Sequence, residues 1–157
     1  MKKVIIVLGV FLLVSLLSLA GVSCKSEEPA ATLPAKNGGV PEVLLEVSCD
    51  KFMQQKHIAK QIEVIYPGSL IVSLCSNPTT GFQWNESTQI SDPSVLQQYS
   101  HSFVAPQPRG ALGAPGKDVW TFKTLNKGTS TISLEYSRPW EGGEKREWTY
   151  TLTVIVK

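Results

Sequence analysis

Residues 148–156 read WTYTLTVIV, and this stretch decides the fold class. Large apolar side chains stand at every even position, with Thr149, Thr151 and Thr153 between them. Successive side chains of a strand point to opposite faces, so this period of two predicts a strand with one buried face. Aromatic and β-branched residues also suit a pleated, half-buried surface.

The same alternation recurs upstream. Residues 120–123 and 132–137 alternate cleanly, and the runs 43–47, 62–65 and 70–75 carry strand patterns that are partly apolar on both faces. Proline- and glycine-containing turns separate these runs, and no stretch of comparable length shows a helical period. Short strands with one apolar face must stack two sheets. We therefore expect an all-β fold, an immunoglobulin-like antiparallel β-sandwich, with a small closed barrel as the alternative.

Residues 1–23 have the layout of a secretory signal peptide, because Lys2 and Lys3 precede an apolar run that ends in small residues. Cys24 follows Gly21-Val22-Ser23, which is similar to a bacterial lipoprotein cleavage box, although Gly21 stands where an aliphatic residue is usual. We expect export, with a lipid attached at Cys24 holding the protein to a membrane in the cell envelope or at the cell surface. Ordinary cleavage, giving a secreted protein, is the alternative.

Residues 24–41 are rich in Ser, Glu, Pro, Ala and Gly and are predicted to be a flexible tether before a single domain at 42–157. The chain has 15 basic and 13 acidic residues, so loss of Lys2 and Lys3 leaves 13 of each. This near-neutral balance argues against nucleic acid as a partner. Cys49 and Cys75 could form a disulfide in an exported protein or stay as buried thiols on separate strands.

Three connections carry unusual residues. The first loop, 77–82, reads NPTTGF, where Pro78 and Gly81 favour a preformed shape. Thr79 and Thr80 offer small side chains with one hydroxyl each, able to enter a narrow slot and form hydrogen bonds there. The second loop, 106–116, is long and glycine-rich, so its backbone can approach a partner closely. The third loop, 138–143, joins the last two strands and presents Arg and Trp, the residues enriched in interface hot spots. A plain turn, a mobile connection and a Trp folded under its own loop are the alternative interpretations.

These motifs, in this order, resemble the three signatures of the chagasin family of cysteine protease inhibitors, inhibitor family I42. The resemblance rests on residues 77–84, on the glycine-rich loop leading into Trp120-Thr121-Phe122, and on residues 136–141, and it covers roughly 43–157. It implies a reversible, competitive protein inhibitor that blocks the active-site cleft of papain-like cysteine proteases without covalent chemistry. The two domain cysteines and the lipoprotein-like start depart from the family pattern.

The resemblance also implies roles for the loops. The first loop would lie over the catalytic cysteine and histidine of the enzyme, with Thr79 and Thr80 closest to the thiol, and the other two loops would clamp the cleft. Trp140 would stack on the enzyme's surface beside the cleft. The protease-binding residues expected on this basis are Asn77, Pro78, Thr79, Thr80, Gly81, Phe82, Gly110, Leu112, Gly113, Arg138, Pro139 and Trp140.

Two other classes of function are weighed against inhibition. An enzyme is disfavoured, because both domain cysteines fall in predicted strands, the acidic residues form no close pair, and no His/Cys spacing suggests a zinc site; we expect no catalytic residue, metal or cofactor. The alternative is a cell-surface adhesion or carbohydrate-binding module on the same sandwich. It is disfavoured because most aromatics fall at inward strand positions, while Trp140 stands alone in a loop.

Overall fold

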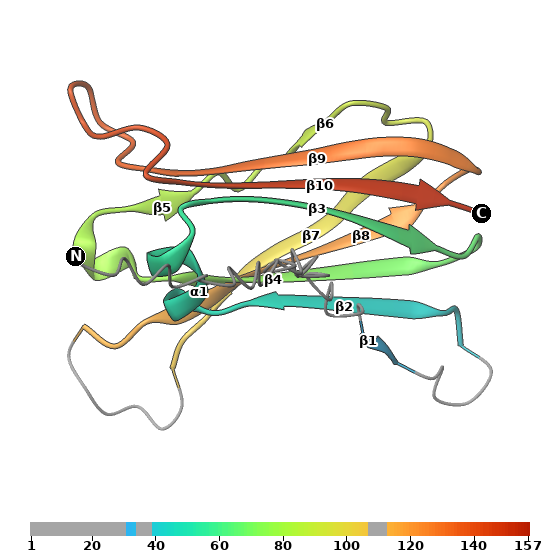
Figure 1. The fold of residues 1–157 in the computed structure, drawn as a ribbon, viewed down its shortest axis with the longest axis horizontal. Helices are drawn as coiled ribbons and strands as arrows, with labels where there is room; N and C mark the ends of the chain where they lie inside the picture. Colours follow the sequence, from blue (N-terminus) through green and yellow to red (C-terminus); the bar gives the residue numbers. More distant parts are fainter. Residues whose placement is uncertain (1–30, 34–38, 107–112) are drawn as a thin grey trace, which may run out of the picture.

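The computed structural model describes residues 31–33, 39–106 and 113–157, which form a two-layered β-sandwich (Figure 1). The expected signal peptide, Cys24 and much of the predicted tether lie outside the described residues. Three residues of that tether form β1 (Ala31–Leu33), which pairs antiparallel with the following strand. Over the described residues, no helix is both long enough and apolar enough to cross a membrane.

Within these residues the strands form two sheets. The first has the order β1-β2-β4-β8-β7, with β2 (Glu42–Val47), β4 (Ser69–Ser76), β7 (Leu96–Val104) and β8 (Gly116–Thr124). The second has the order β3-β10-β9-β5, with β3 (His57–Val64), β5 (Gln83–Trp84), β9 (Gly128–Ser137) and β10 (Trp148–Val156). A short strand, β6 (Gln89–Ile90), also pairs with β9.

The core lies between the two sheets and confirms the predicted alternation. Trp120 and Phe122 of β8 are fully buried, and so are Leu152 and Val154 of β10. The inward residues of both sheets form one continuous hydrophobic cluster. Each large side chain buried in this way contributes about 1.5–3 kcal/mol, so the inward faces hold the two sheets together.

The all-β, immunoglobulin-like sandwich is confirmed, but two strand pairs differ from the expected antiparallel arrangement. β2 runs parallel to β4, and β3 runs parallel to β10. The chain leaves β2 for the second sheet, forms β3 there, and returns to the first sheet as β4. Alternation within a strand records which face is buried but not the direction of its neighbour, so the pattern could not reveal these pairs.

A short helix, α1 (Cys49–Gln54), was not expected from the sequence. Ser48 caps it by accepting a hydrogen bond from the Lys51 amide at 3.3 Å, and Phe52 is its fully buried residue. Six residues are too few to display a helical period. The expectation that Cys49 lies in a strand is therefore wrong, because Cys49 begins this helix.

Cys49 and Cys75 form a disulfide, which decides between the two alternatives left open by the sequence. Their Cα atoms are 5.0 Å apart although 26 residues separate them along the chain. That separation lies within the range that a disulfide requires. The bond joins the start of α1 to the end of β4.

Candidate functional site

The first loop, the third loop and the described ends of the second loop, residue 106 and residues 113–116, lie at the same end of the sandwich (Figure 1). The pairing register brings them together: Ser76 at the end of β4 pairs with Gly116 at the start of β8, and Val104 at the end of β7 pairs with Lys117. Trp84, just after the first loop, pairs with Tyr136, just before the third. Loops far apart in the sequence are therefore neighbours in space.

Asn77 organises the first loop. Its backbone amide donates to the Tyr136 hydroxyl at 2.9 Å, and its carbonyl accepts from both the amide and the hydroxyl of Thr80, at 3.1 and 2.7 Å. Residues Pro78–Thr80 form a short 3-10 turn, closed by the Gly81 amide donating to the Pro78 carbonyl at 3.0 Å. Gly81 ends the turn with φ of 80°, a conformation that disfavours side chains. The first loop is thus preformed by its own hydrogen bonds.

The hydroxyl protons of Thr79 and Thr80 are used within the loop. Thr79 Oγ1 donates to Asn77 Oδ1 at 2.6 Å, and Thr80 Oγ1 donates to the Asn77 carbonyl. Both residues are exposed at the tip of the loop. They therefore offer a partner their methyl groups and the lone pairs of their oxygens, while their protons stabilise the loop.

The first loop is tied to the second through Gly113. Asn77 Nδ2 donates to the Gly113 carbonyl at 2.8 Å, and a β-carbon at Gly113 would lie 3.8 Å from Thr79 Oγ1. Asn77, Thr79 and Gly113, all expected in the site, are therefore brought together. Gly110 and Leu112 lie outside the described residues.

The first loop meets the third through aromatic contacts. The Trp140 ring lies against Gly81, where a β-carbon would stand 2.6 Å from Trp140 Cη2. Arg138 places its guanidinium 4.4 Å above the centre of the Phe82 ring and 5.9 Å from that of Trp140. Such cation–π contacts hold a charged group over a ring face. Trp140 is 52% exposed, so a large apolar surface faces solvent at the loop end.

Hydrogen bonds behind the third loop hold its backbone. Lys145 Nζ donates to the carbonyls of Arg138 and Trp140, the latter at 2.9 Å. The Arg138 amide donates to the Glu144 carbonyl at 2.8 Å, and the Gly143 amide donates to the Trp140 carbonyl at 3.1 Å. Pro139, which lies between Arg138 and Trp140 in the sequence, is exposed. The third loop therefore has a defined shape, like the first.

Two residues that support the site were not foreseen as part of it. Tyr136 was interpreted as a core strand residue and stands in the third signature, but no role was assigned to its hydroxyl, which accepts the Asn77 amide. The available signal was chemical, since a buried Tyr hydroxyl usually finds a polar partner. Lys145 lies in a polar segment that carried no distinguishing pattern.

An aromatic cluster of Phe52, Phe82, Trp84, Tyr136 and Trp148 lies beneath the loops. Ring centres are 5.0 Å apart for Trp84 and Tyr136, and 4.7 Å apart for the stacked pair Tyr136 and Trp148. Phe82 stacks on Tyr136 at 5.5 Å, which joins the first loop to this layer. Aromatic pairs in these geometries contribute about 0.5–1.5 kcal/mol beyond burial. The loops are therefore supported by a layer of packed aromatic rings.

One ion pair fastens the chain beside this layer. Lys56 Nζ contacts Glu147 Oε1 at 2.5 Å, which links the start of β3 to the residue before β10. The hydrogen bond raises the pKa of Lys56 and lowers the pKa of Glu147. Lys56 is exposed and Glu147 is partly exposed, so the pair fixes geometry more than it adds stability.

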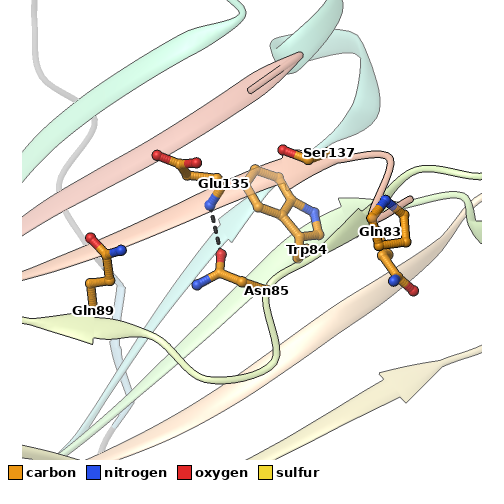
Figure 2. Close-up of a pocket in the computed structure, with 7 residues that line it drawn as sticks. Gln83, Trp84, Asn85, Gln89, Glu135 and Ser137 are labelled. Carbon is orange, nitrogen blue, oxygen red and sulfur yellow. Dashed lines mark hydrogen bonds between the residues drawn. The ribbon is translucent and has the colours of Figure 1, made fainter. Parts of the chain in front are cut away.

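A shallow cavity of about 260 Å³ lies beside the third loop (Figure 2). Its lining residues are Gln83, Trp84, Asn85, Gln89, Glu135, Ser137 and Pro139. The side chain of Asn85 is already hydrogen-bonded within the protein. Its Oδ1 accepts a hydrogen bond from the Glu135 amide at 2.7 Å, and its Nδ2 donates to the Ser87 carbonyl at 2.7 Å. Among the residues that the structure describes, no group of three His, Cys, Asp or Glu side chains could hold a metal ion.

The loop end therefore offers a preformed surface of small exposed threonines beside one exposed Trp. Comparison with known proteins shows what the chain is similar to. A sequence profile described as chagasin family peptidase inhibitor I42 matches residues 68–154, a span that includes all three loops.

Amoebiasin-2 of Entamoeba histolytica is 30% identical over 107 residues, which are 67% of this chain and 84% of that protein. Chagasin of Trypanosoma cruzi is 33% identical over 78 residues, 48% of this chain and 70% of chagasin. The crystal structure of the cysteine protease inhibitor EhICP2 from Entamoeba histolytica is similar with a TM-score of 0.56 at 25% identity, covering 73% of this chain and 96% of that one.

Proposed function

The chain belongs to the chagasin family of peptidase inhibitors, and from this premise we propose that it is a reversible, competitive inhibitor of papain-like cysteine proteases. Proteins of this family are protease inhibitors and not enzymes, and EhICP2, compared above, is a cysteine protease inhibitor. In this proposal the first, second and third loops together enter the active-site cleft. The inhibitor forms no covalent bond with the enzyme.

The observation that carries the proposal is the direct contact of both flanking loops with the first loop. Asn77 bonds to Gly113 of the second loop, and Gly81 touches Trp140 of the third. We use the word wedge for the three loops together, which enter the groove of the enzyme in this proposal. A wedge must keep its shape as it enters, because loops that become ordered only on binding lose conformational entropy, and this loss lowers the affinity. The internal hydrogen bonds of the first loop remove much of that cost.

The chemistry of the tip suits a cleft that contains a nucleophile. Thr79 and Thr80 present small, β-branched side chains whose hydroxyl protons are already used by Asn77. In the proposed complex these residues lie closest to the catalytic thiol and fill the space that a substrate carbonyl would occupy. A backbone held in a closed 3-10 turn cannot extend along the cleft as a substrate does, so we expect it to resist cleavage.

Trp140 and Arg138 supply the flanking contact. An exposed Trp beside a stacked Arg is typical of an interface hot spot. In the proposed complex Trp140 stacks on the enzyme's surface beside the cleft, and Pro139 limits the motion of the segment between the two side chains. An interface of this class buries roughly 1,600 Å² in total.

Export belongs to the proposal as well. We propose that residues 1–23 direct the chain out of the cytoplasm and that Cys24 carries a lipid, so that residues 24–41 tether the inhibitor to a membrane. The Cys49–Cys75 disulfide supports export, because such bonds persist in oxidising compartments. Mass spectrometry of the mature N-terminus, isolated from its native cell envelope, tests this part separately.

The function is tested by titrating the purified protein into papain with a fluorogenic peptide substrate. We expect loss of activity that is overcome by more substrate and fully restored on dilution, as a reversible competitive inhibitor requires. The intact mass of the recovered inhibitor should be unchanged. If micromolar protein leaves papain and related enzymes fully active, the proposal fails, and binding to a glycan array would then favour the carbohydrate-binding alternative.

A further inference from the structure

The Cys49–Cys75 disulfide is attached at the root of the first loop. Cys75 is buried near the end of β4, and Asn77 follows it by two residues. The Cys75 carbonyl accepts a hydrogen bond from Trp84 Nε1 at 2.9 Å, on the other side of the same loop. Both ends of the first loop therefore converge on Cys75.

The other half of the disulfide anchors α1, which delivers Phe52 into the aromatic cluster. The Phe52 ring lies 5.3 Å from the centre of Trp84 and stacks on Trp148 at 5.1 Å. Trp148 in turn stacks on Tyr136, whose hydroxyl accepts the Asn77 amide. A second series of contacts thus connects α1 to the first loop, through rings rather than through β4.

The helix α1 is too short to be stable by itself. A helix of six residues is far below the length at which helices are stable in isolation. Its residue Met53 is 68% exposed, and Phe52 is its buried side chain. The covalent bond at Cys49 therefore adds to the packing of the Phe52 ring and to the short connections from β2 and to β3 in fixing where Phe52 sits.

From these contacts we infer that Cys49 and Cys75 are positioning residues for protease inhibition. Their disulfide holds the first loop in its binding shape, directly through Cys75 and indirectly through Phe52 and Tyr136. Opening the bond loosens Asn77 and weakens inhibition while the sandwich stays folded. The inference rests on the proposed function, and it makes the inhibitor sensitive to reducing conditions.

The disulfide opens by ordinary thiol–disulfide exchange. A dithiol reductant supplies two electrons and two protons, the S–S bond of Cys49 and Cys75 opens to two thiols, and the reductant closes to its own disulfide. Cys75 is only 3% exposed, so we expect attack at Cys49, which is less buried.

The test compares the C49A/C75A variant with Leu70→Ala. Leu70 is fully buried near the far end of β4, so its truncation also destabilises the sandwich but leaves the loop root intact. Papain is activated and then desalted, so that the wild-type disulfide survives the assay. All proteins are measured at a temperature where circular dichroism shows them folded.

We expect the inhibition constant of C49A/C75A to rise about tenfold, mostly through faster dissociation, and that of Leu70→Ala to stay within twofold of wild type. Amide hydrogen exchange distinguishes local loosening of the first loop from destabilisation of the whole domain. Exchange at Asn77 and Gly81 should accelerate in C49A/C75A more than exchange in β9 and β10, and Leu70→Ala should not show this difference.

Unchanged inhibition together with unchanged exchange at Asn77 would overturn the inference. If C49A/C75A does not fold, reduction of the wild-type protein by graded dithiol, with thiols counted by alkylation, provides the same comparison. If the whole sandwich unfolds whenever the disulfide opens, the bond serves only the stability of the fold, and this result would also overturn the inference. Should wild-type protein fail to inhibit papain, the proposed function fails, while the exchange rates still decide whether the disulfide holds the loop.

Discussion

The Trp140 ring closes the space over Gly81 so tightly that a β-carbon at Gly81 would stand 2.6 Å from Trp140 Cη2. Glycine is needed here for two reasons, because its φ of 80° also lies in the left-handed region. The contact couples the position of the exposed Trp to the shape of the first loop. It makes the first and third loops one surface.

Gly81→Ala should therefore displace Trp140 and weaken inhibition of papain. Gly142→Ala is a matched control, since Gly142 has φ of 70° but no atom within 4 Å of its would-be β-carbon. Both changes carry a backbone cost of about 1 kcal/mol, and only Gly81→Ala adds the clash. We expect its inhibition constant to rise at least about tenfold above that of Gly142→Ala; equal values would contradict the coupling.

Bulky residues at the tip of the first loop should weaken inhibition without unfolding the protein. Thr79→Phe and Thr80→Phe remain exposed in the free protein but collide with the walls of a narrow cleft. Thr129→Phe, at the exposed far end of β9, is the control for a surface Phe. Thermal unfolding should shift little in all three variants, and inhibition that survives at full strength in the tip variants would refute the wedge for this loop.

Trp140 and Trp148 should respond to truncation in opposite ways. Trp140 is exposed, so Trp140→Ala should leave the unfolding midpoint nearly unchanged and cost about 2 kcal/mol of binding, the level of a hot spot. Trp148 stacks between Phe52 and Tyr136, so Trp148→Ala should cost about 3–5 kcal/mol of folding stability. Denaturant titration and inhibition constants on both variants separate the two effects, and a reversed pattern would mean that interface and core are interchanged.

Tyr150→Phe should raise stability by about 1 kcal/mol, because it removes a buried hydroxyl that no other described residue hydrogen-bonds. Tyr150 is fully buried, whereas Tyr99 is 66% exposed, so Tyr99→Phe is the control. Guanidinium unfolding at pH 7 measures the difference. A loss of stability in Tyr150→Phe would indicate that the hydroxyl is hydrogen-bonded after all.

The same variant tests a pH effect. Burial raises the pKa of Tyr150 above its ordinary value of about 10, so the folded protein keeps the phenol protonated at a pH where the unfolded chain ionises it. The unfolded state then binds fewer protons, and stability falls as the pH rises above about 10. Unfolding titrations between pH 9 and 11 should show a shallower decline in Tyr150→Phe than in wild type, with parallel declines contradicting the assignment.

Much of the candidate site could be read from the sequence, since its residues form contiguous motifs with special backbone chemistry. The loops that carry Asn77, Gly81, Gly113 and Trp140 lie together in the structure, as the family resemblance implied. Their role in binding a protease stays a prediction. The sequence could not show that the hydroxyl protons of Thr79 and Thr80 are used within the loop, because a short loop satisfies its own polar groups when a side chain such as Asn77 is within reach. Such local competition depends on coordinates that a motif does not contain.

By itself the sequence determined that residues 120–123, 132–137 and 148–156 are strands with one buried face, because a period of two in residues such as Trp120, Phe122 and Leu152 follows from strand geometry alone. Strands without a clean alternation, such as β7, could not be identified in this way. The tertiary structure decided what the strands meet: the parallel partners of β2 and β3, the bond between Cys49 and Cys75, and the Tyr136 hydroxyl beneath Asn77, 59 residues away. These contacts join distant parts of the chain, and they are selected by the free energy of packing the whole molecule, to which no single stretch of sequence gives access.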